Sequence, residues 1–222
     1  LYTCNPNIYL HKGNIYIHQR WVNYYYNEMG NRIITPKKWI SLNSRFIIDE
    51  KLDIISNEIF MDDDYEIFKT YSHIGIEDIR LFNYNNVTYY IGTTLDRKRN
   101  NTSITSNIYD IDNNVFELNK KIINPTFYDL NLYKIPEKNW VFVEYKDKPC
   151  IVYKWYPLQI GSIDYNKGNL DLIHVNYIMD DFFKDAKGSS CGLKYKNRIW
   201  FLLHKSQVNN RHNRPEIFNI CY

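Results

Sequence analysis

Residues 7–18, NIYLHKGNIYIH, show the pattern that decides the fold. Two short segments rich in Ile and Tyr flank the polar turn His11-Lys12-Gly13-Asn14. β-Branched and aromatic residues favour strands, and two such segments around a glycine-containing turn predict a β-hairpin. The same strand–turn–strand pattern returns further along the chain, at residues 79–91, 140–153 and 192–203.

The second and third hairpins are each followed by further candidate strands. These are residues 104–109 and 115–118 after the second hairpin, and 160–165 and 170–175 after the third. Units of about four strands, repeated roughly every 50 to 70 residues, are typical of β-propeller blades. A β-sandwich with irregular hairpins is the alternative, but the recurring turns favour the propeller. We predict an all-β fold, with one β-propeller domain over residues 1–222 that holds about three blades and part of a fourth and is incomplete at its C-terminus.

The composition is that of a folded chain without an extreme charge. Of the 222 residues, 44% are hydrophobic and 17% aromatic, and the net charge is +3. This charge gives no reason to expect a nucleic-acid or membrane partner. The four cysteines are widely spaced and signal neither a metal site nor a disulfide framework, which favours a reduced compartment such as the cytoplasm. Frequent Asn, Ile, Lys and Tyr, whose codons are AT-rich, indicate an AT-rich source genome such as that of a large DNA virus, a protist or a low-GC bacterium.

The second hairpin opens with Gly75-Ile76-Glu77-Asp78-Ile79-Arg80-Leu81-Phe82. Two adjacent carboxylates and an arginine here begin a strand instead of lying on a solvated helix face. Such charges are costly to bury unless each has a partner. A turn with a surface salt bridge is one interpretation of this stretch, and a site at the mouth of a sheet is the other.

The openings of the four units carry a series of polar motifs in a fixed order. They are Asn5-Pro6 with Arg20, then Gly75 to Arg80, then Lys138-Asn139 before Trp140, and last the Gly188 loop with His204. This series resembles the five-bladed propeller enzymes of the β-mannoside phosphorylase family, glycoside hydrolase family 130, and their mannosyltransferase-type relatives. The chain departs from the family pattern at Ile79 and Val143, where the family has proline.

The resemblance implies a role for each matching residue. Asp78 falls on the general acid of the family. The substrate-binding positions fall on Glu77, Arg80 and Asn139, and the phosphate-binding positions fall on Arg20, Lys138 and His204. The implied reaction is inverting phosphorolysis or glycosyl transfer at a β-mannoside-type bond of an oligosaccharide or glycan. Inorganic phosphate or a nucleotide sugar is then the co-substrate, with no metal or other cofactor.

The distribution of charges agrees with such a reaction. A phosphorylase needs cations in place of a second carboxylate, because phosphate is itself the nucleophile. Cations stand at the unit-leading and hairpin-closing positions, namely Arg20, Arg80, Lys138, Lys154, Lys187 and His204.

Two other functions stay open at this point. A hydrolase of a related propeller clan would place Glu144 or another acid opposite Asp78. A non-catalytic glycan-binding propeller would fit the missing proline at Ile79. Asp78 can also be a turn carboxylate and His204 a core histidine, and homo-oligomer formation is left open.

Overall fold

The computed structural model describes most of the chain, namely residues 1–27, 32–34, 39–60, 73–96, 101–113, 115–116, 121–126, 137–209 and 214–221. The chain divides into two compact units, Leu1–Ile79 (unit 1) and Arg80–Tyr222 (unit 2). Strands dominate both units, and in the described residues the helical structure is a short 3-10 turn, η3 (Asp181–Phe183). The prediction of an all-β fold is therefore confirmed. Within the described residues, no helix is long and apolar enough to cross a membrane.

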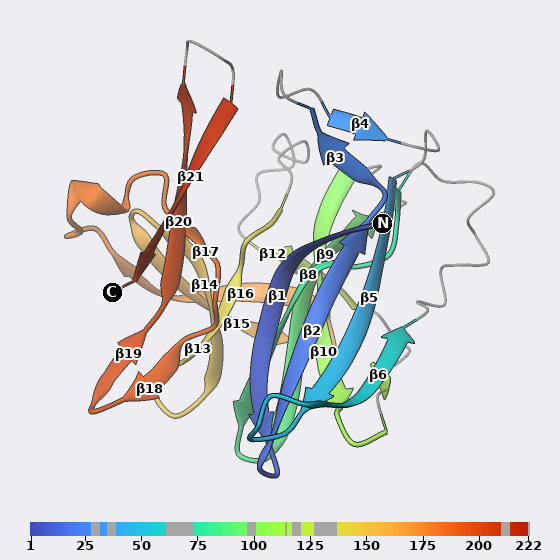
Figure 1. The fold of residues 1–222 in the computed structure, drawn as a ribbon. Coiled ribbons are helices and arrows are strands. Elements are labelled where there is room, and N and C mark those ends of the chain that lie inside the picture. Colours follow the sequence, from blue (N-terminus) through green and yellow to red (C-terminus); the bar gives the residue numbers. More distant parts are fainter. Residues whose placement is uncertain are drawn as a thin grey trace. The chain divides into compact units, whose positions relative to one another are not determined.

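Unit 1 is built on one antiparallel sheet, drawn in blue to cyan in Figure 1. Its strands follow the order β1 (Tyr2–His11), β2 (Asn14–Val22), β5 (Trp39–Ile48) and β6 (Ile54–Phe60). Two smaller pieces complete the unit: β7 (His73–Ile74), which pairs in parallel with β5, and the small sheet β3 (Tyr24–Tyr26) and β4 (Arg32–Ile34). His11 pairs with Asn14 across the first turn, so the hairpin predicted from residues 7–18 is confirmed.

Unit 2 contains most of a larger sheet, whose strands succeed one another as predicted from the hairpins. Its first group is β8 (Glu77–Tyr84), whose first residues belong to unit 1, with β9 (Val87–Asp96), β10 (Asn101–Asp110), β11 (Val115–Phe116) and β12 (Lys121–Pro125). Its second group is β13 (Val141–Glu144), β14 (Pro149–Trp155), β15 (Leu158–Asp164) and β16 (Asn169–Asn176). β12 joins the groups by pairing antiparallel with β10 and parallel with β16.

The last group of strands differs from the prediction of one continuous strand over residues 198–203. The group consists of β17 (Lys187–Gly188), β18 (Leu193–Tyr195), β19 (Arg198–Trp200), β20 (Leu202–Asn209) and β21 (Arg214–Cys221). The strand is broken at Phe201, so that β19 pairs with β18 while β20 pairs with β17 and β21. The cause is local to Leu202, whose N–H donates to Ser190 Oγ and whose carbonyl accepts from Ser189 N.

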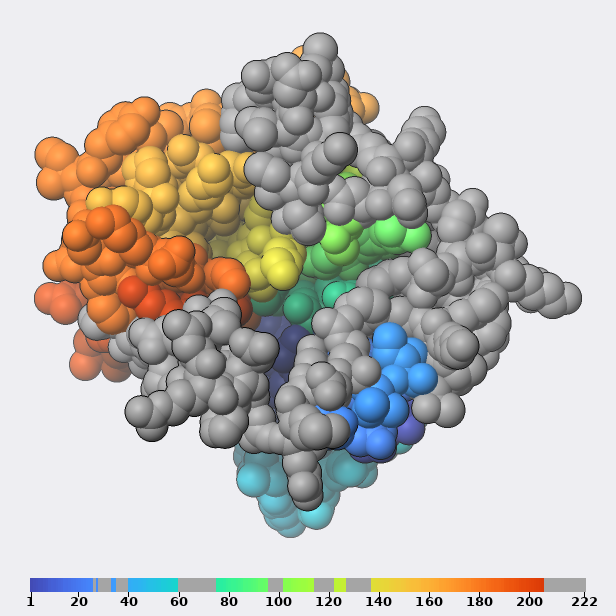
Figure 2. All heavy atoms as spheres, turned by 90° about the horizontal axis from the view of Figure 1, so that it is seen from above, coloured from blue at the N-terminus to red at the C-terminus, as the bar shows by residue number. Residues whose placement is uncertain are grey.

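Strand β13 explains how unit 2 is packed. Trp140 and Phe142 enter one buried cluster with Phe82, while Val141 and Val143 enter another with Leu203. The side chains of a strand point alternately to its two faces, so both faces of β13 are buried. The rings of Phe82 and Phe142 stack with their centroids 5.3 Å apart. Figure 2 shows residues 137–205, in yellow to orange-red, as one continuous surface.

Candidate active site

The turn before β8 is fixed to β5 at Gly75. A Cβ at this position would stand 2.0 Å from the carbonyl oxygen of Ser41, and the φ of Gly75 is +90°, so only glycine fits. Next along the chain, Asn43 donates a 2.9 Å hydrogen bond from its side chain to the carbonyl of Ile76. These contacts hold the backbone that carries Glu77 and Asp78.

Asp78 has a left-handed backbone, with a φ of +53°. Aspartate and asparagine tolerate this conformation better than most residues. Ile79 follows, and it imposes none of the restriction that a proline would place on the preceding residue. The Oδ1 atom of Asp78 accepts a 2.9 Å hydrogen bond from Arg20 Nη1 and a 2.6 Å hydrogen bond from Asn5 Nδ2. The carboxyl group is therefore held by two strands of unit 1.

Arg20 on β2 is shared between the two carboxylates. Its Nη2 lies 2.5 Å from Glu77 Oε1, and its Nε donates a 3.1 Å hydrogen bond to Ser41 Oγ. Only 5% of the Arg20 side chain is exposed, against 14% for Glu77 and 21% for Asp78. This is a largely desolvated cluster and not a solvated surface salt bridge. Burial lowers the pKa of Arg20, but the charges of Glu77 and Asp78 outweigh burial and raise it above its ordinary value.

Arg80 belongs to unit 2 and has a different role from Arg20. Its Nε donates to the carbonyl of Ser189 at 2.8 Å, and its Nη2 donates to the carbonyl of Gly188 at 3.2 Å. His204 on β20 reaches the same turn, with Nδ1 2.7 Å from Ser189 Oγ. Arg80 is buried, and it and His204 both hold the turn at the end of β17.

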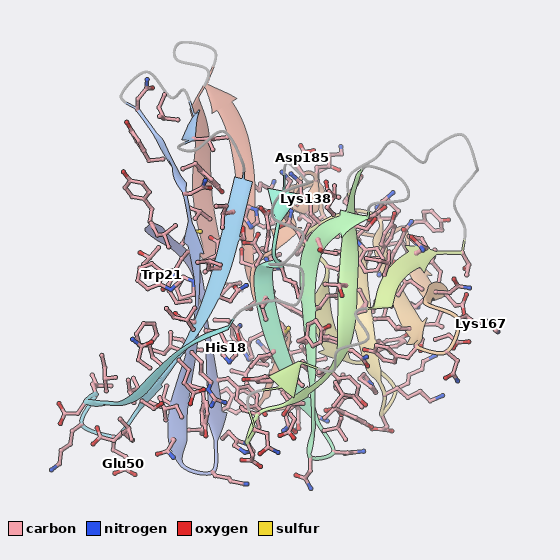
Figure 3. All side chains as sticks on the ribbon, turned by 90° about the vertical axis from the view of Figure 1, so that its right-hand side faces the viewer. His18, Trp21, Glu50, Lys138, Lys167 and Asp185 are labelled. Carbon is pink, nitrogen blue, oxygen red and sulfur yellow. The ribbon has the colours of Figure 1, made fainter. Side chains whose placement is uncertain are left out.

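A pocket of about 200 Å³ lies in unit 2 beside this turn. Its charged groups are three lysines and one acid, namely Lys138, Lys154, Lys187 and Asp185. Its other lining residues are Asn139, Tyr153, Trp155, Tyr156, Phe183 and Ala186. Figure 3 labels Lys138 and Asp185, which come from segments far apart in the sequence. We call this feature the lysine pocket.

Glu137 supports one wall of the lysine pocket from behind. Its carboxyl group accepts a 2.9 Å hydrogen bond from Trp140 Nε1 and a 3.3 Å hydrogen bond from the Tyr153 hydroxyl. Burial raises the pKa of Glu137 above its usual range, although both hydrogen bonds oppose this. Asn139, two residues on, has a left-handed backbone with a φ of +63°, a conformation that asparagine tolerates.

The predicted residues thus fall into two sets. Arg20, Glu77 and Asp78 meet in unit 1, whereas Lys138 and Asn139 line the lysine pocket of unit 2, with Arg80 and His204 at the neighbouring turn. Glu144 ends β13 and is 2.7 Å from Lys194. Lys154 and Lys187 at strand ends, and Asn5 in the Asn5-Pro6 motif, had sequence signals, whereas no sequence signal pointed to Asp185. Among the described residues, no cluster of His, Cys, Asp or Glu could hold a metal ion.

Comparison with solved structures settles the fold. A glycosyl hydrolase from Bacteroides ovatus matches with a TM-score of 0.62 at 12% identity, over 96% of this chain and 62% of that chain. β-1,2-Mannobiose phosphorylase from Listeria innocua, in complex with β-1,2-mannobiose, matches with a TM-score of 0.57 at 10% identity, over 98% and 70%. The fold class is the five-bladed β-propeller.

A third match comes from glycoside hydrolase family 130, the mannoside phosphorylases, which also contains hydrolases that target β-1,2-mannosidic linkages in Candida mannan. Its TM-score is 0.54 at 12% identity, over 96% of this chain and 62% of that chain. The structural resemblance expected from the sequence motifs is thus confirmed at the level of fold. No family model and no curated protein matches the sequence. The chain spans 62% to 70% of the length of these three solved chains.

Proposed function

We propose that this chain is part of a carbohydrate-active enzyme that cleaves or forms β-mannoside-type glycosidic bonds, with Asp78 as the general acid. The observation that carries the proposal is the conformation of Asp78. Its backbone has a φ of +53°, and Arg20 and Asn5 both bond to its Oδ1. A partly buried carboxylate that a charged partner holds in one position is typical of functional sites.

The proposed reaction is inverting phosphorolysis or glycosyl transfer. Asp78 takes up a proton from solvent and gives it to the glycosidic oxygen, so the bond between that oxygen and the anomeric carbon breaks with a neutral leaving group. In phosphorolysis an oxygen of inorganic phosphate attacks the anomeric carbon from the opposite face, and a sugar 1-phosphate of inverted configuration forms. In transfer, a hydroxyl oxygen of the acceptor attacks the anomeric carbon of a nucleotide sugar, the nucleoside diphosphate leaves, and the hydroxyl proton passes to the carboxylate of Asp78.

The lysine pocket supports a phosphate-bearing co-substrate. Its lining residues include three lysines and one acid, Asp185, so the net charge of the lining favours an anion. We assign phosphate binding first to Lys138, and substrate contact to Asn139 beside it. We propose that Arg20 holds the two carboxylates. Phosphate contact by Arg20 and His204 stays a prediction, as does substrate contact by Glu77 and Arg80.

The test is turnover of β-1,2-mannobiose with and without phosphate, and of a nucleoside diphosphate mannose with an acceptor sugar. Phosphate-dependent formation of a sugar 1-phosphate, read by ³¹P NMR, supports phosphorolysis. Release of mannose regardless of phosphate supports the hydrolase alternative. Binding of the disaccharide without any product supports the glycan-binding alternative.

Two variants decide the role of Asp78. Asp78→Asn keeps the shape and the left-handed backbone but cannot donate the proton, so turnover should fall by at least about 100-fold with an unchanged fold. Asp164→Asn is the matched control, because Asp164 caps the exposed turn between β15 and β16 by accepting from Asn166 N and Lys167 N. Full activity of Asp78→Asn would overturn the assignment.

A further inference from the structure

Two groups of exposed apolar residues, one on each unit, lie beside charges of opposite sign. On unit 2 they belong to the β18–β19 hairpin and its continuation, namely Leu193, Tyr195, Ile199, Trp200 and Leu202, with the cations Lys194, Lys196 and Arg198. We call this the hairpin surface. On unit 1 they belong to β6 and the turn before it, namely Leu52, Ile54, Ile55 and Ile59, with the acids Asp49, Glu50 and Asp53. We call this the edge surface.

The hairpin surface is apolar for a solvent-exposed ribbon. Its five large apolar side chains are 40% to 67% exposed. Leu193 pairs with Trp200 and Tyr195 pairs with Arg198, so these four side chains share one face of the hairpin. β18 and β19 form a sheet of their own, and Figure 1 shows them projecting from unit 2. A two-stranded hairpin is marginally stable alone, so this one gains from a partner that covers it.

The edge surface offers a strand to which another can be added. β6 is the last strand in the order β1–β2–β5–β6, and no other described strand pairs with its outer side. Ile54, Ile55 and Ile59 on it are 58% to 65% exposed. The turn before it is well formed, because Asp49 Oδ1 accepts from Lys51 N and Asp53 N. Figure 3 shows Glu50 at the far end of unit 1, with its side chain pointing outward.

We propose that the hairpin surface of one copy docks on the edge surface of a second copy. Long apolar edge strands are natural sites for strand addition from another chain. The charges match: the hairpin carries three cations, of which Lys194 also bonds Glu144, and the turn before β6 carries three acids against the single cation Lys51. Because the two surfaces differ, each contact joins the hairpin surface of one copy to the edge surface of another copy, and neither surface pairs with its own counterpart.

Sedimentation velocity on the full chain tests this proposal independently of any enzymatic activity. In about 50 mM salt, the sedimentation coefficient should rise with protein concentration above that of the monomer. In about 500 mM salt, where opposite charges are screened, the association should weaken by at least about tenfold. A monomer at all concentrations and both salts would overturn the proposal, as would association that does not depend on salt.

Two single substitutions distinguish docking between two different surfaces from contact of one surface with its own counterpart. Trp200→Asp disables the hairpin surface and Ile55→Asp disables the edge surface, and each variant alone should be monomeric. Mixed in equal amounts, each variant supplies the surface that the other lacks, so the mixture should form a heterodimer and nothing larger. This recovery also shows that both variants are folded. Ile173→Asp, at a 46% exposed position on β16, is the control and should associate like the unaltered chain. A mixture that stays monomeric, or a variant that associates alone, would contradict the proposed contact.

Discussion

Arg20 holds Asp78 through a 2.9 Å contact between Nη1 and Oδ1, from a side chain that is 5% exposed. Arg20→Met would leave two partly buried carboxylates without their cation, which we expect to cost about 2–4 kcal/mol of unfolding free energy. Arg20→Lys keeps the charge but lacks the fork that reaches both Glu77 and Asp78, and it should cost about 1 kcal/mol. Urea unfolding measures both values.

The same variants separate support of the fold from support of the reaction. Arg45→Lys is the matched control, because Arg45 is also buried in the sheet of unit 1 and lies 2.8 Å from Glu58. We expect Arg20→Lys to lower kcat more than it changes KM, since it displaces Asp78, while Arg45→Lys affects stability alone. Equal effects of both substitutions on kcat would show that Arg20 acts only through the stability of unit 1.

The turn at Gly75 gives a second prediction. Gly75→Ala should lower the free energy of unfolding by more than about 3 kcal/mol, because the added Cβ would stand 2.0 Å from the carbonyl oxygen of Ser41 at a φ of +90°. Gly13→Ala is the control, since Gly13 has a φ of +81° but nothing within 4 Å of a Cβ. It should cost about 1 kcal/mol, the strain of a left-handed alanine alone. Similar thermal unfolding midpoints for the two variants would show that the close approach to Ser41 is not needed.

His18 predicts how stability depends on pH. Burial, reinforced by the charge of Arg45, lowers the pKa of His18 to about 3, against about 6.5 in an unfolded chain. Between these values the unfolded state binds the proton and the folded state does not, so stability falls as the pH falls from about 6.5 toward 3. The slope from this residue is at most about 1.4 kcal/mol per pH unit.

Urea midpoints at several pH values between about 4.5 and 7.5 check the role of His18. We expect His18→Gln to show a shallower loss of stability below about pH 6.5 than the unaltered chain. The difference between the two curves isolates His18 from the carboxylates, which titrate in both proteins. Parallel curves would show that the histidine gains a proton without unfolding the sheet.

The lysine pocket gives a prediction about binding alone. Lys154→Met removes one of its three cations and should weaken phosphate binding by about tenfold, which corresponds to roughly 1.4 kcal/mol. Lys167→Met is the control, because Lys167 lies on the turn between β15 and β16, 3.4 Å from Asp164 and outside the pocket. Titration calorimetry with inorganic phosphate measures both. Equal phosphate affinities of the Lys154→Met and Lys167→Met variants would show that Lys154 does not bind the anion. That result would leave the proposed role of Asp78 unchanged.

The strands were predictable because their signals are local. The turn at Lys12-Gly13 and the apolar residues around it lie within a dozen positions and specify one hairpin. The break at Phe201 was not predictable, because it depends on hydrogen bonds from Ser189 and Ser190 to Leu202, which come from another strand connection.

In the candidate site, too, the residues could be found from the local sequence, but their partners could not. The acids at 77 and 78 stand out in the sequence, and Arg80 is the nearest cation. In the structure Asp78 instead pairs with Arg20, which lies 58 residues earlier in the sequence, and Arg80 bonds the turn at Ser189. Sequence proximity cannot reveal this choice, because it is made by the pairing of β2 with β5 and by the close contact at Gly75.

The left-handed backbone of Asp78 also limits how this position can evolve. With a φ of +53°, the residues that fit without much strain are glycine, asparagine and aspartate, and only aspartate carries a proton to give. The easiest neutral replacement is therefore asparagine, which would preserve the fold and end the proposed chemistry in one step. If the proposed function holds, a descendant with asparagine here and with Arg20 and Asn5 retained should bind the sugar without turning it over.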